Sequence, residues 1–186
     1  MHEDTRKKWN KLTTTETELI THLDNILVEK LKFQTYAEIQ ITSKYLDIRK
    51  LTPTKQEQLR IDLAAINQVD GSIYFFEAEI QIHTQHPSIY QEFCDYCYLL
   101  CPDEQFDYLD SVTKRQQLSW AETQGIGIIT ISNQGALRVR LHAKRQNMRP
   151  EVRKEVLRVM NKRYSIRFPT LPLWERSRSK YSKMDT

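Results

Sequence analysis

The chain has 186 residues, of which 39% are hydrophobic and 28% are charged. This length and composition suit a single domain that buries its core without disulfides or a structural metal. The apolar runs are too short to span a bilayer, and the initial segment MHEDTRKKWNKL lacks the apolar stretch of a secretory signal. We therefore expect a soluble, cytoplasmic protein with no membrane partner.

Charge is distributed unevenly along the chain. The formal net charge is +4, but residues 137–186 contain 15 Lys and Arg against 4 Asp and Glu, which leaves −7 for residues 1–136. We expect one domain over residues 1–165 and a basic tail over residues 166–186. Clustered cations of this kind bind polyanions such as nucleic acid or an anionic membrane surface. The alternative is a solvated helix face followed by a loose tail.

The hydrophobic pattern predicts helices and strands in a mixed order. A helix follows the capping-box pair Thr15 and Glu18, with apolar residues at helical spacing up to Leu31. Strands are predicted at 36–42, 59–66 and 72–82, with a loop at 43–58 and a tight turn at Asp70-Gly71.

Downstream, the pattern predicts a helix at 87–96, a buried strand at 97–102 and a helical region that ends near Gln124. Two strands follow at 125–131 and 136–142, around the turn Asn133-Gln134-Gly135. The last predicted element is an amphipathic helix at 149–164. The order of these elements is typical of an α/β protein, here an α+β mixed sheet flanked by helices.

The three cysteines, Cys94, Cys97 and Cys101, are clustered and odd in number, so they do not form a disulfide framework. Their spacing is compatible with a metal site. The segment FCDYCYLLCP is nevertheless crowded with aromatic and leucine side chains, and no fourth ligand is near it, which favours buried, inert thiols.

The stretch FFEAEIQ places Glu77, Glu79 and Gln81 at every second position of a predicted strand. Side chains alternate across a strand, so these three polar groups share one face. The preceding strand carries Asp62 between two apolar residues, and the hairpin would bring that carboxylate alongside. Carboxylates this close repel one another unless a hard cation, Mg2+ or Mn2+, takes their oxygens as ligands. Such a cation can polarise a phosphoryl oxygen and activate water for phosphodiester hydrolysis.

Each of these acids also has a simpler interpretation. Asp62 could form a salt bridge with Arg60 or cap a neighbouring turn. Glu77 could lie at the solvated end of an edge strand. Glu38 alternates in the same way in YAEIQIT and is interpreted as a surface residue.

The arrangement resembles the PD-(D/E)xK nuclease superfamily, whose core places an Asp on one strand and an acid-x-Lys triplet on the next. Within it, the chain is similar to the MmcB-like DNA repair endonucleases over residues 16–160. The matching segments are YAEIQIT, RID, IYFFEAEIQ, IYQEFCDYCYLLCPDE, GIGIITISNQGALRVR and RPEVRKEVLRV. The resemblance implies a restriction-endonuclease-like fold with Asp62, Glu79 and Gln81 as catalytic residues and Asp62, Glu79 and Glu77 as metal ligands.

One residue departs from the family pattern. Gln81 stands where the family has a lysine, and a glutamine can orient a water by hydrogen bonds but brings no positive charge. Some superfamily members have glutamine there, and others use acid-x-acid, which would make Glu77-Ala78-Glu79 the triplet. Three residues are candidates to replace the missing charge: Lys44, Arg60 and His83. The family also suggests a role near the metal for Glu18 and matches Glu38 to an acid of its first strand.

We therefore predict a metal-dependent DNA endonuclease with Mg2+ or Mn2+ as cofactor. The alternative is a catalytically inactive nuclease-fold protein that binds nucleic acid. An adaptor that meets an acidic protein or membrane is a third class. An enzyme that cuts both strands would work as a homodimer. The predicted DNA-binding residues lie in the last helix: Arg149, Arg153, Lys154, Arg158, Lys162 and Arg163.

Overall fold

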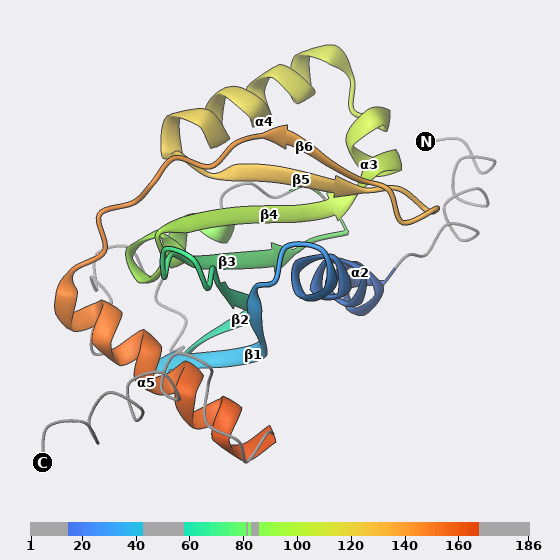
Figure 1. Ribbon diagram of the computed structural model, residues 1–186. Helices are drawn as coiled ribbons and strands as arrows, with labels where there is room; N and C mark the ends of the chain where they lie inside the picture. The colour runs from blue at the N-terminus through green and yellow to red at the C-terminus, as the bar shows by residue number, and fades with distance from the viewer. Residues whose placement is uncertain (1–14, 43–57, 81, 83–85, 168–186) are drawn as a thin grey trace, which may run out of the picture.

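A computed structural model describes residues 15–42, 58–80, 82 and 86–167 of the chain. The predicted loop at 43–58 and the basic tail therefore lie almost entirely outside the described residues. The described chain forms an α+β fold with a six-stranded mixed sheet flanked by helices, as the sequence predicted (Figure 1). The strands are β1 (Gln34–Thr42), β2 (Gln58–Ile66), β3 (Ile73–Ala78), β4 (Tyr96–Pro102), β5 (Gly127–Ile131) and β6 (Leu137–Leu141).

The sheet has the strand order β1-β2-β3-β4-β5-β6. The first three strands form an antiparallel meander, with the predicted turn before β3 closed by Gly71 at φ +70°. The next two strands run parallel to β3, and β6 returns antiparallel at the edge. Because β3, β4 and β5 are parallel, their carboxyl ends lie side by side at one end of the strands and their amino ends lie side by side at the other end.

One helix covers one face of the sheet. The helix α2 (Glu16–Glu29) begins at the predicted capping box, with Thr15 and Glu18 bonded in both directions. Leu19, Leu23 and Leu27 are buried along the helix and pack on Phe76 and its neighbours in β2 to β5. Figure 1 shows α2 lying across the sheet.

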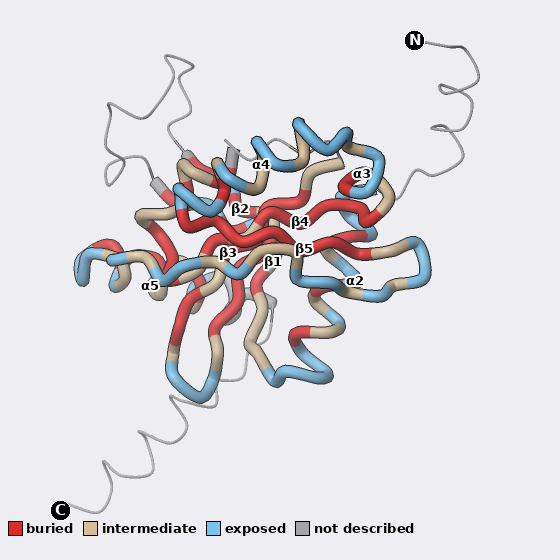
Figure 2. The backbone as a smooth tube through the Cα atoms, turned by 90° about the horizontal axis from the view of Figure 1, so that it is seen from above, coloured by how far each residue is buried: buried red, intermediate tan, exposed pale blue. Residues whose placement is uncertain are grey.

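The other helices lie on the opposite face or beside the sheet. They are η3 (His86–Phe93), α3 (Asp103–Tyr108), α4 (Ser111–Gln124) and α5 (Pro150–Arg167). The segment predicted as an α-helix at 87–96 is a 3-10 helix, η3, that ends at Phe93. As predicted, α5 buries Val152, Val156 and Met160 against β1 and β2. The sheet backbone is mostly buried and the outer turns of α4 are exposed (Figure 2).

The three cysteines are buried and free, which confirms the prediction of buried thiols. Cys94 donates to the carbonyl of Tyr90 and Cys97 to that of Pro87, and both thiols lie in the core under α5. Burial raises the pKa of the Cys101 thiol to about 12. Such thiols are poor nucleophiles and poor metal ligands at neutral pH.

The strands β1 and β2 change face together at Glu38 and Asp62. Glu38 has φ +51°, and it interrupts the pairing between Ala37–Leu63 and Ile39–Ile61. On β1, both Tyr36 and Ile39 face the core under α5, although they are three residues apart and a regular strand would turn them to opposite faces. On β2 the same core receives Ile61 on one side of the break and Ala64 on the other. The regular alternation assumed from the sequence is therefore wrong at this point.

None of the helices among the residues described here is both long and apolar enough to cross a membrane.

Candidate active site

Asp62 lies where the pairing of β2 with β3 ends. The last paired residues are Leu63 and Phe76, and continuing the register would place Asp62 opposite Glu77. One carboxylate oxygen of Asp62 instead accepts a hydrogen bond from the backbone N–H of Ala78, at 3.0 Å. The side chain thus takes the place of a backbone acceptor. The prediction that this strand runs to residue 82 is wrong, because β3 ends at Ala78.

Glu79 follows directly and is held from the other side. Its backbone N–H donates to the carbonyl of Leu100 in β4, at 2.9 Å, so the pairing with β4 continues one residue beyond the strand. Ile80 packs in the same cluster as Phe76 and Ala78. Because these three alternate residues share one face, Glu79 points to the opposite face, the face of Glu77. Gln81 lies outside the described residues.

Glu77 is buried inside the domain. Its side chain is 6% exposed, and Tyr90 of η3 places its hydroxyl 3.3 Å from Oε1 and 3.0 Å from the carbonyl oxygen of Arg60. Burial, followed by the negative charges of Glu77 and Asp62, raises the pKa of Tyr90 well above its usual range. The interpretation of Glu77 as a solvated residue of an edge strand is therefore wrong. Tyr90 was not predicted as a site residue, since nothing in PSIYQEF distinguishes it from an ordinary core tyrosine.

The described part of the chain offers a partial metal site. No three His, Cys, Asp or Glu side chains within it are placed so that they could hold a metal ion. Asp62 nevertheless accepts the N–H of Ala78, the residue before Glu79, and Asp62 and Glu77 both lie close enough to Tyr90 to raise its pKa. Mg2+ is commonly held by one or two carboxylates together with waters and substrate phosphates, so two carboxylates at this position fit that ion.

Of the three candidates for the missing positive charge, the structure describes Arg60 alone. Arg60 is exposed and lies between Leu59 and Ile61, which both face the core, so it points to the other side of the sheet. Regular alternation along this strand would place Arg60 on the same face as Asp62, and the change of face at Asp62 separates them. Lys44 and His83 lie outside the described residues, and Glu18 is bonded to Thr15 in the capping box.

The predicted DNA-binding residues of α5 divide into two groups. Arg153 is bound inside the fold, 2.8 Å from Asp95 and in contact with the carbonyl of Gly71. Arg158 forms a two-point ion pair with Glu155 one turn earlier. The side chain of Arg163 lies outside the described set. The remaining three cations are exposed on the helix or just before it: Arg149, Lys154 and Lys162.

A second charged cluster joins the carboxyl end of β4 to β5 and β6. Asp103 is 5% exposed and accepts hydrogen bonds from Thr130, Arg138 and Arg140. Burial opposes the ionisation of Asp103, but these bonds and the two arginine charges lower its pKa overall. Arg140 also lies over the ring of Phe106, 5.0 Å from its centre. No sequence pattern indicated this cluster, because its members are far apart in the chain.

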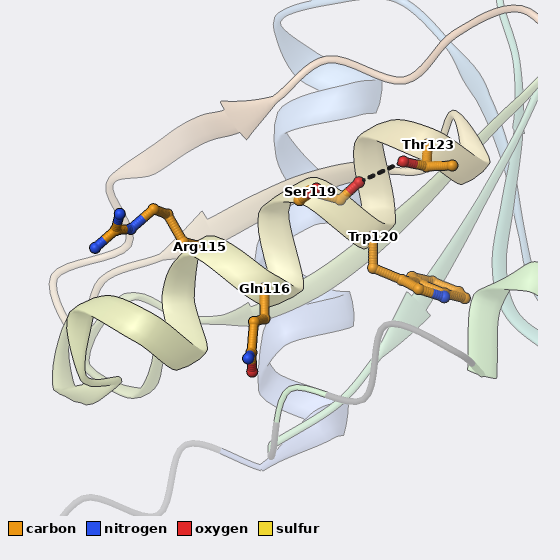
Figure 3. Close-up of a pocket in the computed structure, with 5 residues that line it drawn as sticks. All are labelled: Arg115, Gln116, Ser119, Trp120 and Thr123. Carbon is orange, nitrogen blue, oxygen red and sulfur yellow. Dashed lines mark hydrogen bonds between the residues drawn. The ribbon is translucent and has the colours of Figure 1, made fainter.

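An open hollow of about 530 Å³ lies beside α4. Figure 3 shows Arg115 and Trp120 pointing in different directions, so the two do not converge on one ligand. Thr123 donates to the carbonyl of Ser119 within the helix, at 2.8 Å. The lining contains no acid, histidine or cysteine, and we assign it no chemistry: Arg115, Gln116, Ser119, Trp120 and Thr123.

Comparison with known proteins supports the fold alone. The sequence matches no family model and no curated protein at a significant level. The structure is similar to the SPO1766 protein of Silicibacter pomeroyi, a protein of unknown function, with a TM-score of 0.50 and 14% sequence identity. The similarity covers 85% of this chain and 95% of that one, so nearly the whole of that protein shares the arrangement.

Proposed function

We propose that the protein is a metal-dependent DNA endonuclease with a restriction-endonuclease-like fold. The observation that carries the proposal is the hydrogen bond from the N–H of Ala78 to Asp62, at 3.0 Å. It fixes the Asp62 carboxylate at the residue that immediately precedes Glu79. An acid on one strand is thus held next to the residue that precedes an acid on the following strand, and two such carboxylates could hold the Mg2+ or Mn2+ ion that assists phosphodiester hydrolysis.

The residues divide the work between holding the ion and positioning the site. Asp62 and Glu79 would hold Mg2+ or Mn2+, which would polarise a phosphoryl oxygen and lower the pKa of a bound water. The backbone bonds of Ala78 and Glu79 to two different strands hold both acids in place without help from the substrate. Glu77, buried against Tyr90, is a supporting acid behind them. Gln81 retains its predicted role of orienting water by hydrogen bonds.

The substrate follows from charge. The exposed cations Lys154 and Lys162 of α5, with Arg149 just before it, would contact phosphates and give a steep dependence of binding on salt. We propose that the protein acts in the cytoplasm. Cleavage of both strands would need two copies of the chain, each contributing one site.

A second candidate is a nucleic-acid-binding protein that keeps the fold without catalysis. Gln81 in place of a lysine and the partial ligand set of the described residues favour it. The two candidates differ in one observable, which is cleavage that depends on a divalent ion.

The test compares the parent protein with Asp62→Asn and Glu79→Gln on supercoiled, linear and single-stranded DNA. Each reaction contains Mg2+, Mn2+ or EDTA. Asparagine keeps an oxygen that can accept the Ala78 N–H, so Asp62→Asn removes charge and leaves the fold intact. We expect cleavage only with metal, and a loss of at least about a hundred-fold in both variants.

Glu16→Gln is the matched control, since it removes an exposed carboxylate from the first turn of α2 and should cleave like the parent. Absence of cleavage by the parent, with equal DNA binding by all variants, would leave the non-catalytic candidate.

A further inference from the structure

A row of aromatic rings lies on the sheet face that α2 covers only in part. Tyr74 of β3 stacks on Tyr96 of β4, with ring centres 4.8 Å apart and planes at 20°. Phe76 and Tyr98, one step further along the same strands, are 5.7 Å apart at the same angle. Phe33, which follows α2, meets Tyr74 at 5.2 Å. All of these rings except Phe76 are partly exposed.

The pairing of the strands explains the row. Tyr74 is the direct neighbour of Tyr96, and Phe76 of Tyr98, in the parallel ladder. The next neighbour of Tyr98 is Gly127 of β5. A Cβ atom at Gly127 would lie 2.2 Å from the Tyr98 ring, so the ring lies directly over the glycine backbone. The absence of a side chain there allows the aromatic surface to extend across three strands.

Cations border this surface near the amino ends of β4 and β5. The connector at residues 142–149, between β6 and α5, is fastened by hydrogen bonds from Lys144 N–H to Gly125 and from Gln146 N–H to Asp95. Arg145 is 66% exposed and lies 3.9 Å from Asp95, the residue before Tyr96. No acid occurs anywhere in residues 123–150.

The other end of the row has cations too. Lys30 and Lys32 are exposed and flank the end of α2 just before Phe33. Asp70, in the turn before β3, is an acid near Tyr74. The positive charge of Arg145 is close enough to Asp70 to contribute to lowering the pKa of that carboxyl. The rings therefore lie between cations at both ends, with Asp70 at the rim and Asp95 beside Arg145.

We propose that this surface binds single-stranded nucleic acid, with bases stacked on Tyr96 and Tyr74 and phosphates held by Arg145 and by Lys144, whose ammonium leaves the carbonyl of Glu122, 3.1 Å away, to reach them. Exposed aromatic rings beside cations are the combination that unpaired strands require, because every base has a face that can stack. The inference rests on the proposed function for the nucleic-acid class of the ligand and adds that the strand is unpaired. The surface also lies on the sheet face opposite to Glu77 and Tyr90, so it is a separate contact.

Binding in EDTA tests the surface without involving catalysis. Fluorescence anisotropy would compare a labelled single-stranded oligonucleotide with its duplex, using Tyr96→Leu, Tyr96→Phe and the pair Lys144→Gln/Arg145→Gln. Tyr108→Leu, a tyrosine 69% exposed on α3, and the pair Lys114→Gln/Arg115→Gln on α4 are the matched controls. Circular dichroism and a thermal melt establish that each variant is folded.

We expect the parent to bind the single strand more tightly than the duplex. Tyr96→Leu should weaken binding about ten-fold, Tyr96→Phe should restore it, and the controls should bind like the parent. Removing Lys144 and Arg145 should lower the slope of log affinity against log salt by about 1.4.

Equal binding by the parent, Tyr96→Leu and the connector pair would overturn the proposal. So would a parent that forms a dimer in sedimentation and loses it on Tyr96→Leu, since the exposed Val28 and Leu31 near Phe33 would then mark an interface between copies. If the parent does not cleave DNA but still binds the single strand through Tyr96, the endonuclease proposal is rejected and the binding surface is kept. If the parent cleaves DNA but Tyr96→Leu does not change binding, the binding surface is rejected and the endonuclease proposal is kept.

Discussion

Arg153 of α5 and Asp95 at the start of β4 form an ion pair 2.8 Å long, although 58 residues separate them in the chain. Asp95 is 3% exposed, and it also accepts the N–H of Ile73 at 2.8 Å. One buried carboxylate thus ties the hairpin before β3, the entry to β4 and the last helix together.

Loss of this pair should destabilise the domain. Arg153→Met keeps the aliphatic length but leaves the buried Asp95 with only the longer contact to Arg145, 3.9 Å away, so we expect the free energy of unfolding to fall by about 3 kcal/mol. Urea denaturation followed by circular dichroism measures the change. Arg149→Met, at an exposed site four residues earlier, should change stability by less than about 0.5 kcal/mol. Equal losses at the two positions would show that the contact with Asp95 is unimportant.

A methyl group at Gly127 should be costly because of the ring above it. Its Cβ would lie 2.2 Å from the Tyr98 ring and 2.8 Å from the backbone nitrogen of Ala143. We expect Gly127→Ala to lower the free energy of unfolding by about 2 kcal/mol, in the range of overpacked cores.

A double-mutant cycle with Tyr98→Ala isolates the clash. If Gly127→Ala costs as much in the Tyr98→Ala background as in the parent, the ring is not the cause, and the contact with Ala143 would have to account for the loss.

Acid should weaken the domain partly through Asp103. Burial opposes its charge, but the hydrogen bonds from Thr130 and Arg140 outweigh this and hold its pKa below the ordinary value. A carboxyl with a lowered pKa in the folded state stabilises the protein above its unfolded pKa, near 4, and loses that contribution as pH falls through the folded pKa.

Asp103→Asn should therefore be less stable than the parent at pH 7, by about 1–3 kcal/mol, and the two should converge below pH 4 or so. Urea midpoints across this pH range provide the measurement. A constant difference between the two proteins at every pH would contradict the assignment.

Local signals in the sequence predicted most of the elements. The capping box of Thr15 and Glu18, the Gly71 turn and the apolar stripe of α5 each depend on residues near one another in the chain, and the structure confirms them. The class of fold followed from their order.

The site was predicted only in outline. The spacing of FFEAEIQ indicated that Glu77 and Glu79 share a face, but the sequence could not show that the Asp62 side chain ends β3 at Ala78. It also missed the burial of Glu77 against Tyr90, because that contact depends on how η3 packs on the sheet. Ion pairs such as Asp95–Arg153 were missed for the same reason, since both members look like surface residues in isolation.

The change of face at Glu38 and Asp62 adds no residue to either strand. Ala37 pairs with Leu63 and Ile39 with Ile61, so the register before the break continues after it. The two irregularities therefore compensate for each other, and neither strand could become regular alone without turning part of its apolar side chains away from the core. The backbone of Glu38 and the position of the Asp62 carboxylate form one conformational unit. An alteration at Glu38 would thus reach the proposed metal ligand through the backbone of the neighbouring strand.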